Sequence, residues 1–106
     1  MKPDVLRGHL DALLLAVLER GPLHGYAIME ALQVRSDGAI ELPTGTIYPA
    51  LRRLERGGYL RSEWATVFGR RRRTYQLTGA GRKVLAAERT QWREFTSAIS
   101  GVLGTT

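Results

Sequence analysis

Residues 44–56 have the sequence TGTIYPALRRLER, which predicts an amphipathic helix. At about 100° per residue, its apolar side chains share a narrow arc and its arginines lie on the opposite side. The apolar set is Ile47, Leu51 and Leu54, and the cationic set is Arg52, Arg53 and Arg56. The helix is expected to begin at Thr44 or Thr46, because Pro49 is tolerable near either start, and to end at Gly57 and Gly58. One face is therefore expected in a core, whereas the other is cationic.

Two more helices are predicted before this stretch. The first, for which Asp4 is a candidate N-cap, keeps its leucines at helical spacing and stops at Gly21 and Pro22. The second runs from about residue 24 or 25 to Ser36. Residues 39–42 could add a very short strand. The chain is therefore expected to begin with three helices, of which the amphipathic one is the third.

Two strands and a long helix are predicted after this stretch. Residues 59–67 and 71–77 alternate apolar and polar side chains, so they are expected to form an antiparallel hairpin joined through residues 68–70. The final helix is expected from Thr78, as its N-cap, to about Leu103, a length of about 37 Å. Its apolar residues have the spacing of a helix–helix contact. This stripe begins at Val84 and Leu85 and continues through Trp92, Phe95, Ile99 and Val102.

The net charge of +6 is concentrated in one short segment. Residues 52–73 hold eight arginines and two glutamates, so they account for the whole excess and the rest of the chain is balanced. Four of these arginines, at residues 70–73, are consecutive. They are too many to bury together or to pair with the few nearby carboxylates. This distribution of charge is typical of a protein that binds a polyanion.

Several classes of site are disfavoured by what the sequence lacks. Without cysteine it has neither disulfides nor thiolate metal sites, which fits a reducing cytoplasm. Its two histidines do not suggest a metal site, and its residues show no nucleophile–base set and no cofactor loop. The longest apolar run is far shorter than the roughly 20 residues that span a membrane. We therefore expect a cytoplasmic protein that is not an enzyme and has no metal, cofactor or membrane partner.

Three motifs, in this order, resemble the PadR family of transcriptional regulators, specifically its short, PadR-s2-like subfamily. They are GPLHGY at residues 21–26, TGTIYPALRRLE at residues 44–55 and GRRRRTYQLT at residues 69–78. The resemblance spans nearly the whole chain and implies a mainly α (α+β) fold. A winged helix-turn-helix DNA-binding domain would occupy residues 1–77, and a C-terminal dimerisation helix would occupy residues 78–106. One departure is Gly79, where relatives often have proline, and it is expected only to loosen the start of the last helix.

The resemblance also implies which residues contact double-stranded operator DNA. The third helix would enter a major groove, and the hairpin would lie on the flanking minor groove or the backbone. The predicted DNA-binding residues are Thr44, Thr46, Tyr48, Pro49, Arg52, Arg53, Arg70, Arg71, Arg72 and Arg73. The sequence leaves open which arginines contact bases and which contact phosphates. Of the four in the hairpin, two are expected to face DNA and two to stack along the sheet or on Trp64 and Tyr75. His24 and Tyr26 are expected to organise packing among the three helices, with phosphate contact as the alternative.

By the same resemblance, the chain would be a homodimeric, sequence-specific repressor that a small-molecule inducer releases from DNA. The predicted dimer contacts are Leu85, Trp92, Phe95, Ile99 and Val102. Trp92 is also a candidate ligand residue for a planar aromatic or phenolic inducer, and the alternative is that it simply fills the dimer core. The alternative function is a sequence-tolerant nucleic-acid-binding module without a ligand.

Overall fold

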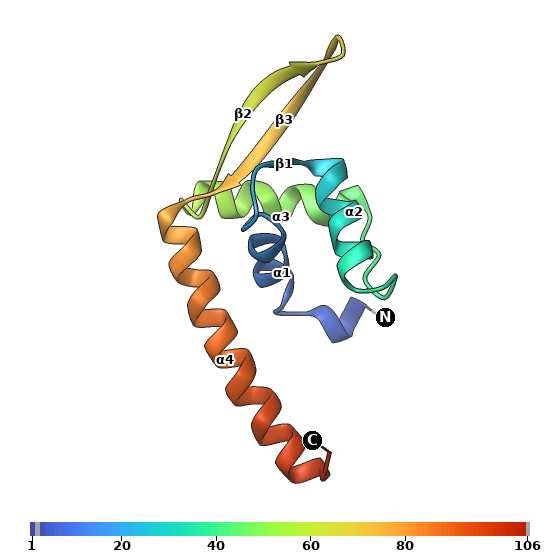
Figure 1. Ribbon diagram of the computed structural model, residues 1–106, viewed down its shortest axis with the longest axis vertical. Coiled ribbons are helices and arrows are strands. Elements are labelled where there is room, and N and C mark those ends of the chain that lie inside the picture. Colours follow the sequence, from blue (N-terminus) through green and yellow to red (C-terminus); the bar gives the residue numbers. More distant parts are fainter. Residues whose placement is uncertain (2, 106) are drawn as a thin grey trace.

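The helix predicted over residues 44–56 is present as α3, and its apolar face lies in the core (Figure 1). The computed structural model describes residues 1 and 3–105. In chain order its elements are a short 3-10 helix η1 (Pro3–Leu6), α1 (Leu10–Val17), β1 (Leu23–His24), α2 (Gly25–Arg35), α3 (Thr44–Arg56), β2 (Leu60–Val67), β3 (Arg70–Leu77) and α4 (Gly79–Leu103). The three strands form one antiparallel sheet in the order β1-β3-β2. This is the expected winged helix-turn-helix, followed by a long helix.

The core lies around α1, which packs against α2, α3 and the first part of α4. Its buried side chains are apolar apart from the tyrosine of β3, and they come from every helix α1–α4 and from the base of the hairpin. They are Leu14, Leu15, Val17, Leu18, Ile28, Leu32, Ile47, Ala50, Leu51, Leu54, Leu60, Tyr75, Leu77 and Leu85. Among the described helices none is long and apolar enough to cross a membrane.

Strands β2 and β3 form a hairpin with a two-residue loop, and this hairpin extends away from the helices (Figure 1). Phe68 and Gly69 connect them, with φ angles of 52° and 76°. Two consecutive positive φ angles are the geometry of the turns that match strand twist in such hairpins. Val67 pairs directly with Arg70, so Arg70 is the first residue of β3. The prediction that Arg70 belongs to the connection was wrong. Strand β3 therefore begins one residue earlier than predicted and carries all four consecutive arginines.

The first helix differs from its prediction at both ends. Asp4 lies in η1, where its carboxylate accepts a hydrogen bond from Arg7 at 3.1 Å, and it does not cap α1. Gly8 has a φ of 83°, which interrupts helical geometry, so α1 begins only after His9. The helix ends at Val17, before the predicted stop at Gly21 and Pro22. The apolar spacing predicted the helix, whereas its ends depend on backbone turns that the spacing does not specify.

The sheet also differs from its prediction in one strand. Residues 39–42 form no strand, and the Ile40 amide instead donates to the Ser36 hydroxyl at 2.8 Å. The third strand is β1, where Leu23 pairs with Tyr75 and His24 pairs with Thr74. A strand of two residues is too short to show an alternating pattern. Its pairing partner also lies about 50 residues away in the sequence, so no local signal reveals the strand.

Helix α4 starts as predicted and then leaves the core. The Thr78 hydroxyl accepts a hydrogen bond from the Gly81 amide at 3.1 Å, so Thr78 is its N-cap. A Cβ atom at Gly81 would lie 2.7 Å from a Leu77 methyl carbon and would overlap the Tyr59 carbonyl, so the helix start packs closely on the hairpin base. Beyond its first turns the helix extends along the longest axis of the molecule (Figure 1). Lys2 and Thr106, which the predicted division into residues 1–77 and 78–106 includes, lie outside the described residues.

Candidate nucleic-acid interface

The exposed side of α3 carries several of the predicted DNA-binding residues. Thr44, Thr46, Pro49 and Arg52 are exposed there, opposite the buried Ile47 face. The helix begins at Thr44, one of the two predicted starts, and its N-cap is Pro43, which offers no side-chain acceptor. Pro49 lies inside α3 and cannot donate to the carbonyl four residues earlier, which belongs to Gly45. The first turns of α3 therefore present small, compact side chains to solvent.

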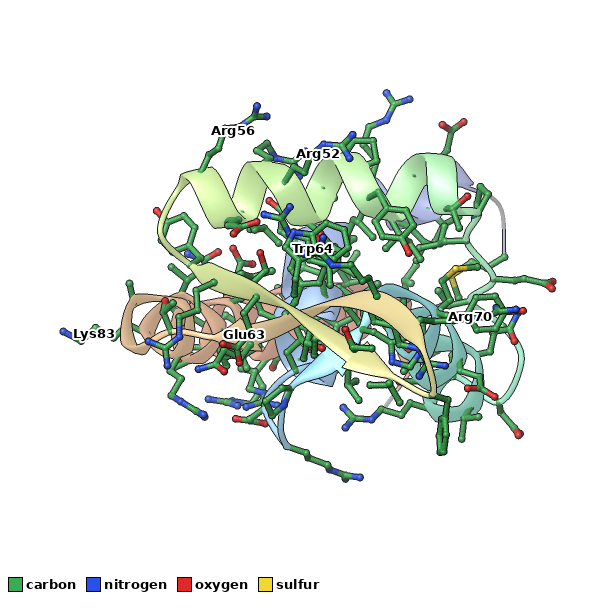
Figure 2. All side chains as sticks on the ribbon, turned by 90° about the horizontal axis from the view of Figure 1, so that it is seen from above. Arg52, Arg56, Glu63, Trp64, Arg70 and Lys83 are labelled. Carbon is green, nitrogen blue, oxygen red and sulfur yellow. The ribbon has the colours of Figure 1, made fainter. Side chains whose placement is uncertain are left out.

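The neighbouring arginines of α3 point to different partners. Arg53 forms an ion pair with Asp11 of α1, although both side chains remain about half exposed. Arg52 has no ion-pair or hydrogen-bond partner in the part of the chain that the structure describes. Arg52 and Arg56 project from the same side of α3 (Figure 2). Of the two arginines predicted to contact DNA from this helix, the structure leaves Arg52 unpaired and pairs Arg53 within the fold.

Trp64 organises two of the four hairpin arginines. The Arg71 guanidinium carbon lies 5.0 Å from the Trp64 ring centroid, and that of Arg73 lies 5.6 Å away. Both distances are within the range of cation–π attraction. Because Trp64 pairs with Arg73 across the sheet, these side chains lie on one face of the hairpin. Two arginines stack on Trp64 as predicted, and Arg70 and Arg72 alternate to the opposite face.

Arg73 is held more firmly than its neighbours. Its Nε donates to the Ser62 hydroxyl at 2.7 Å, and its Nη2 donates to a Glu55 carboxylate oxygen at 3.2 Å. The Ser62 hydroxyl donates in turn to Glu55 at 2.6 Å. This network joins the hairpin to the last turn of α3 and neutralises Arg73 inside the fold. The sequence prediction named Arg73 but missed Ser62, which the sheet register brings beside it, and Glu55, which the packing of α3 on the hairpin brings beside it.

A groove lies between the hairpin, α3 and the start of α2, with a volume of about 430 Å³. Figure 2 shows Trp64 between α3 and the hairpin strands, and Trp64 is one of the residues that line this groove. The lining residues are His24, Gly25, Tyr26, Tyr48, Arg52, Trp64, Arg71, Arg72, Arg73 and Tyr75. Burial raises the pKa of Tyr75 above its ordinary value of 10.0. The groove therefore brings α3 and hairpin residues that were predicted separately into one surface.

Of two tyrosines at this groove, one differs from its predicted role and the other approaches α2 closely. Tyr26 is 67% exposed, so it does not organise packing among the helices as predicted, because its position in the first turn of α2 faces outward. Tyr48 is half-buried, and two carbons of its ring would lie 2.6 Å from a Cβ atom at Gly25. Only glycine therefore allows Tyr48 to approach the start of α2 this closely.

The apolar stripe predicted on the last helix is divided by the structure. Leu85 is only 2% exposed within the chain's own core, so it has no side-chain surface left for a partner. Trp92, Phe95, Ile99 and Val102 remain exposed, by 50%, 53%, 43% and 88%. Trp92 stacks on Phe95 with ring centroids 5.7 Å apart, and His9 meets its edge at 5.1 Å. The exposed apolar stripe consists of these four residues alone among those predicted.

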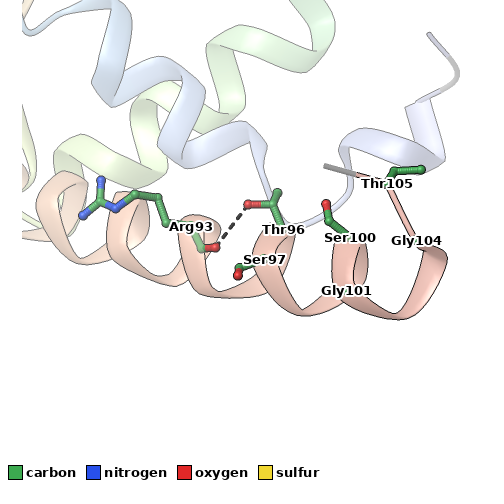
Figure 3. A pocket seen from close by; sticks show the side chains of 7 residues that line it. All are labelled: Arg93, Thr96, Ser97, Ser100, Gly101, Gly104 and Thr105. Carbon is green, nitrogen blue, oxygen red and sulfur yellow. Dashed lines mark hydrogen bonds between the residues drawn. The ribbon is translucent and has the colours of Figure 1, made fainter.

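A second hollow lies at the far end of α4 and does not include this stripe. It has a volume of about 560 Å³ and is lined by Arg93 and small residues, mostly serine, threonine and glycine (Figure 3). The Thr96 hydroxyl there donates to the Arg93 carbonyl at 3.2 Å, as Figure 3 shows. Trp92 is not among the lining residues. Among the described residues no cluster of histidine and carboxylate side chains could hold a metal ion.

Comparison with known proteins places these features in context. Residues 14–87 match the model of the transcriptional regulator PadR-like family. A transcriptional regulator from Clostridium thermocellum is 29% identical with a TM-score of 0.86, and the match covers 95% of this chain and 96% of that chain. A PadR family transcription regulator from Clostridium difficile is 32% identical with a TM-score of 0.80, covering 91% and 99%. A transcriptional regulator from Mycobacterium tuberculosis is 46% identical over 57 residues, or 54% of this chain and 53% of that protein.

Proposed function

The chain belongs to the PadR-like family of transcriptional regulators, and on that premise we propose that it is a sequence-specific repressor that binds operator DNA as a homodimer. Members of this family are DNA-binding regulators and not enzymes. The observation that carries the proposal is the shared placement of Arg52, Arg71 and Trp64 at one groove between α3 and the hairpin. A DNA duplex whose major groove receives α3 would pass along this surface, because the hairpin lies beside α3 on the same side of the protein.

The exposed apolar stripe supports the homodimer. Trp92, Phe95 and Ile99 are each about half exposed in the single chain, on a helix that extends beyond the core. A second copy of α4 would cover them in a two-fold arrangement, in which the same patch of each chain meets its equivalent. Two copies of α3 would then be held at a fixed separation, as the half-sites of an operator require.

Trp92 is the residue we propose for inducer binding. Its indole is half exposed in the single chain even though it contacts His9 and Phe95, so a planar ligand can stack on it in the dimer where the two indoles leave a gap between them. A planar aromatic or phenolic molecule would stack there, and a change in the spacing of the α3 helices would release DNA. Trp64→Phe protein isolates the Trp92 fluorescence, since these are the two tryptophans of the chain. Saturable quenching by planar dyes or phenolic acids, with release of bound DNA, supports the site. An intact dimer without quenching assigns Trp92 to the dimer core.

Selection of bound fragments from genomic DNA of the source organism tests the proposed function. The full chain should enrich a palindromic site whose half-sites lie about 10 base pairs, or a multiple of that, apart. Footprinting on the enriched fragment should protect both half-sites together. If the selection instead returns fragments with no common site, and they bind no more tightly than mixed-sequence DNA, the result supports the sequence-tolerant module. Phosphate contacts alone carry no sequence information.

A further inference from the structure

The groove contains two tyrosine hydroxyls that the fold does not use. The Tyr75 residue is only 2% exposed, yet its hydroxyl has no hydrogen-bond partner among the described residues. Among those residues, every polar side-chain atom that is fully buried has a hydrogen-bond partner. The unpartnered Tyr75 hydroxyl must therefore reach the surface of the groove that it lines. A hydroxyl on an almost fully buried ring that opens only to the groove is placed to bind a group that enters the groove.

The second hydroxyl lies at the start of α2. Tyr48 contacts Gly25, the first residue of that helix, so closely that a Cβ atom there would overlap its hydroxyl. The His24 side chain gives α2 no N-cap hydrogen bond. The first-turn N–H groups of an uncapped helix, with the positive end of its dipole, favour an anion. The helix start and both hydroxyls line the same groove.

The charges around this groove also favour an anion. Arg52 and Arg71 line it without a carboxylate partner among the described residues. The nearby Glu55 carboxylate is occupied by Arg73 and Ser62. The local field is therefore positive, while the two hydroxyls are neutral donors that supply directional hydrogen bonds.

We infer that Tyr75, Tyr48 and the first turn of α2 form a binding site for one backbone phosphate of the DNA strand that passes between α3 and the hairpin. This inference rests on the proposed DNA binding and adds a contact that is independent of sequence. The phosphate oxygens accept from the hydroxyls and from the α2 amides, and the contact positions α3 in its groove. No arginine needs to be displaced from its stacking on Trp64 for this contact.

Tyrosine-to-phenylalanine variants of the full chain test the site, with a mixed-sequence DNA duplex as probe. Tyr75→Phe and Tyr48→Phe each remove a single hydroxyl, and each should weaken binding by about tenfold, the loss of one hydrogen bond to a charged acceptor. The slope of log affinity against log salt should stay unchanged, because tyrosine releases no counterion. Tyr59→Phe is the matched control, since Tyr59 is half-buried outside the groove and should bind as the wild type does.

The outcomes separate this inference from the proposed function. Wild-type affinity in both Tyr75→Phe and Tyr48→Phe overturns the phosphate site while leaving DNA binding intact. A wild-type chain that does not bind the duplex overturns both. Inorganic phosphate at constant ionic strength provides the second arm. If it raises the melting temperature of the wild type but not of Tyr75→Phe, while DNA affinity is equal in the two proteins, then the groove takes a free anion and the assignment to DNA is wrong.

Discussion

Arg53 of α3 and Asp11 of α1 form an ion pair that joins the two helices, whereas the adjacent Arg52 faces the groove unpaired among the described residues. Both members of the pair are about half exposed, so the pair should stabilise the fold by no more than about 1 kcal/mol. Its main effect is on the orientation of the Arg53 side chain, which the pair holds away from the groove that Arg52 lines. The two residues therefore have different expected roles in DNA binding.

Arg53→Ala should change DNA binding less than Arg52→Ala does. Because Asp11 already holds the Arg53 guanidinium, its loss removes an intramolecular pair of at most about 1 kcal/mol. Asp11→Ala is the paired control, since it frees Arg53 without removing its charge. Fluorescence anisotropy with operator and mixed-sequence duplexes measures both effects. A larger loss of operator affinity in Arg53→Ala than in Arg52→Ala would show that Arg53 leaves Asp11 to contact a base.

Arg71→Ala should weaken operator and mixed-sequence DNA alike. Arg71 stacks on Trp64 with no carboxylate partner among the described residues, which suits a phosphate contact from the hairpin. The salt slope of log affinity should fall by about one ion. Titrations at several salt concentrations measure this slope. Arg70→Ala, on the other face of β3 and not among the groove residues, serves as the comparison, and a selective loss on operator DNA in Arg71→Ala would assign base contact to the hairpin.

Substitutions in α4 should separate the core from the dimer contact. Phe95→Ala with Trp92→Ala removes the two aromatic residues of the exposed stripe, so light scattering should show a monomer while the melting temperature of the monomer fold changes little. Leu85→Ala should instead reduce the free energy of unfolding by about 2–5 kcal/mol, because it leaves a cavity in the chain's own core. Sedimentation of the wild type as a monomer at micromolar concentration would remove the proposed dimer.

The Glu19–Arg89 pair should make stability depend on pH at the acidic end. Glu19 accepts two hydrogen bonds from Arg89 at 2.8 Å, and they lower the pKa of its carboxyl below the ordinary value of 4.5. A lowered pKa in the folded state contributes stability above 4.5 that is lost as the pH falls through the folded-state pKa. Melting curves of the wild type and Glu19→Gln should therefore differ at neutral pH and converge in acid. A difference that persists at low pH would contradict this account.

Sequence periodicity predicted the elements that bury a face, for a physical reason. In α3 and α4 the apolar side chains repeat at helical spacing, and in the hairpin they alternate, so burial and local geometry agree. Strand β1 escaped prediction because it consists of two residues and exists only through its pairing with β3. The start of α1 escaped because a single positive φ at Gly8 decides it.

The candidate site was predictable in composition but not in pairing. The charge pattern named the arginines of α3 and the hairpin as a cationic set, and the structure brings several of them to one groove. The charge pattern could not show that Arg53 meets Asp11, or that Arg73 meets Glu55 and Ser62, because these contacts depend on how distant elements pack. The apolar stripe of α4 has the same limit: periodicity placed Leu85 with the exposed residues, and only the packing of α4 on α1 separates it from them.

The most direct test of the central claim is the ratio of two dissociation constants, one for the selected genomic fragment and one for a mixed-sequence duplex at the same salt concentration. For the wild type we expect the fragment to bind about a thousandfold more tightly or better, as specific DNA-binding proteins do. Arg52→Ala should reduce this preference by about 1–3 kcal/mol, because the unpaired Arg52, which lines the groove, is the α3 arginine that we expect to contact a base edge. A wild-type ratio near one, unchanged in Arg52→Ala, would contradict sequence-specific binding by α3 and leave only electrostatic attraction to the backbone.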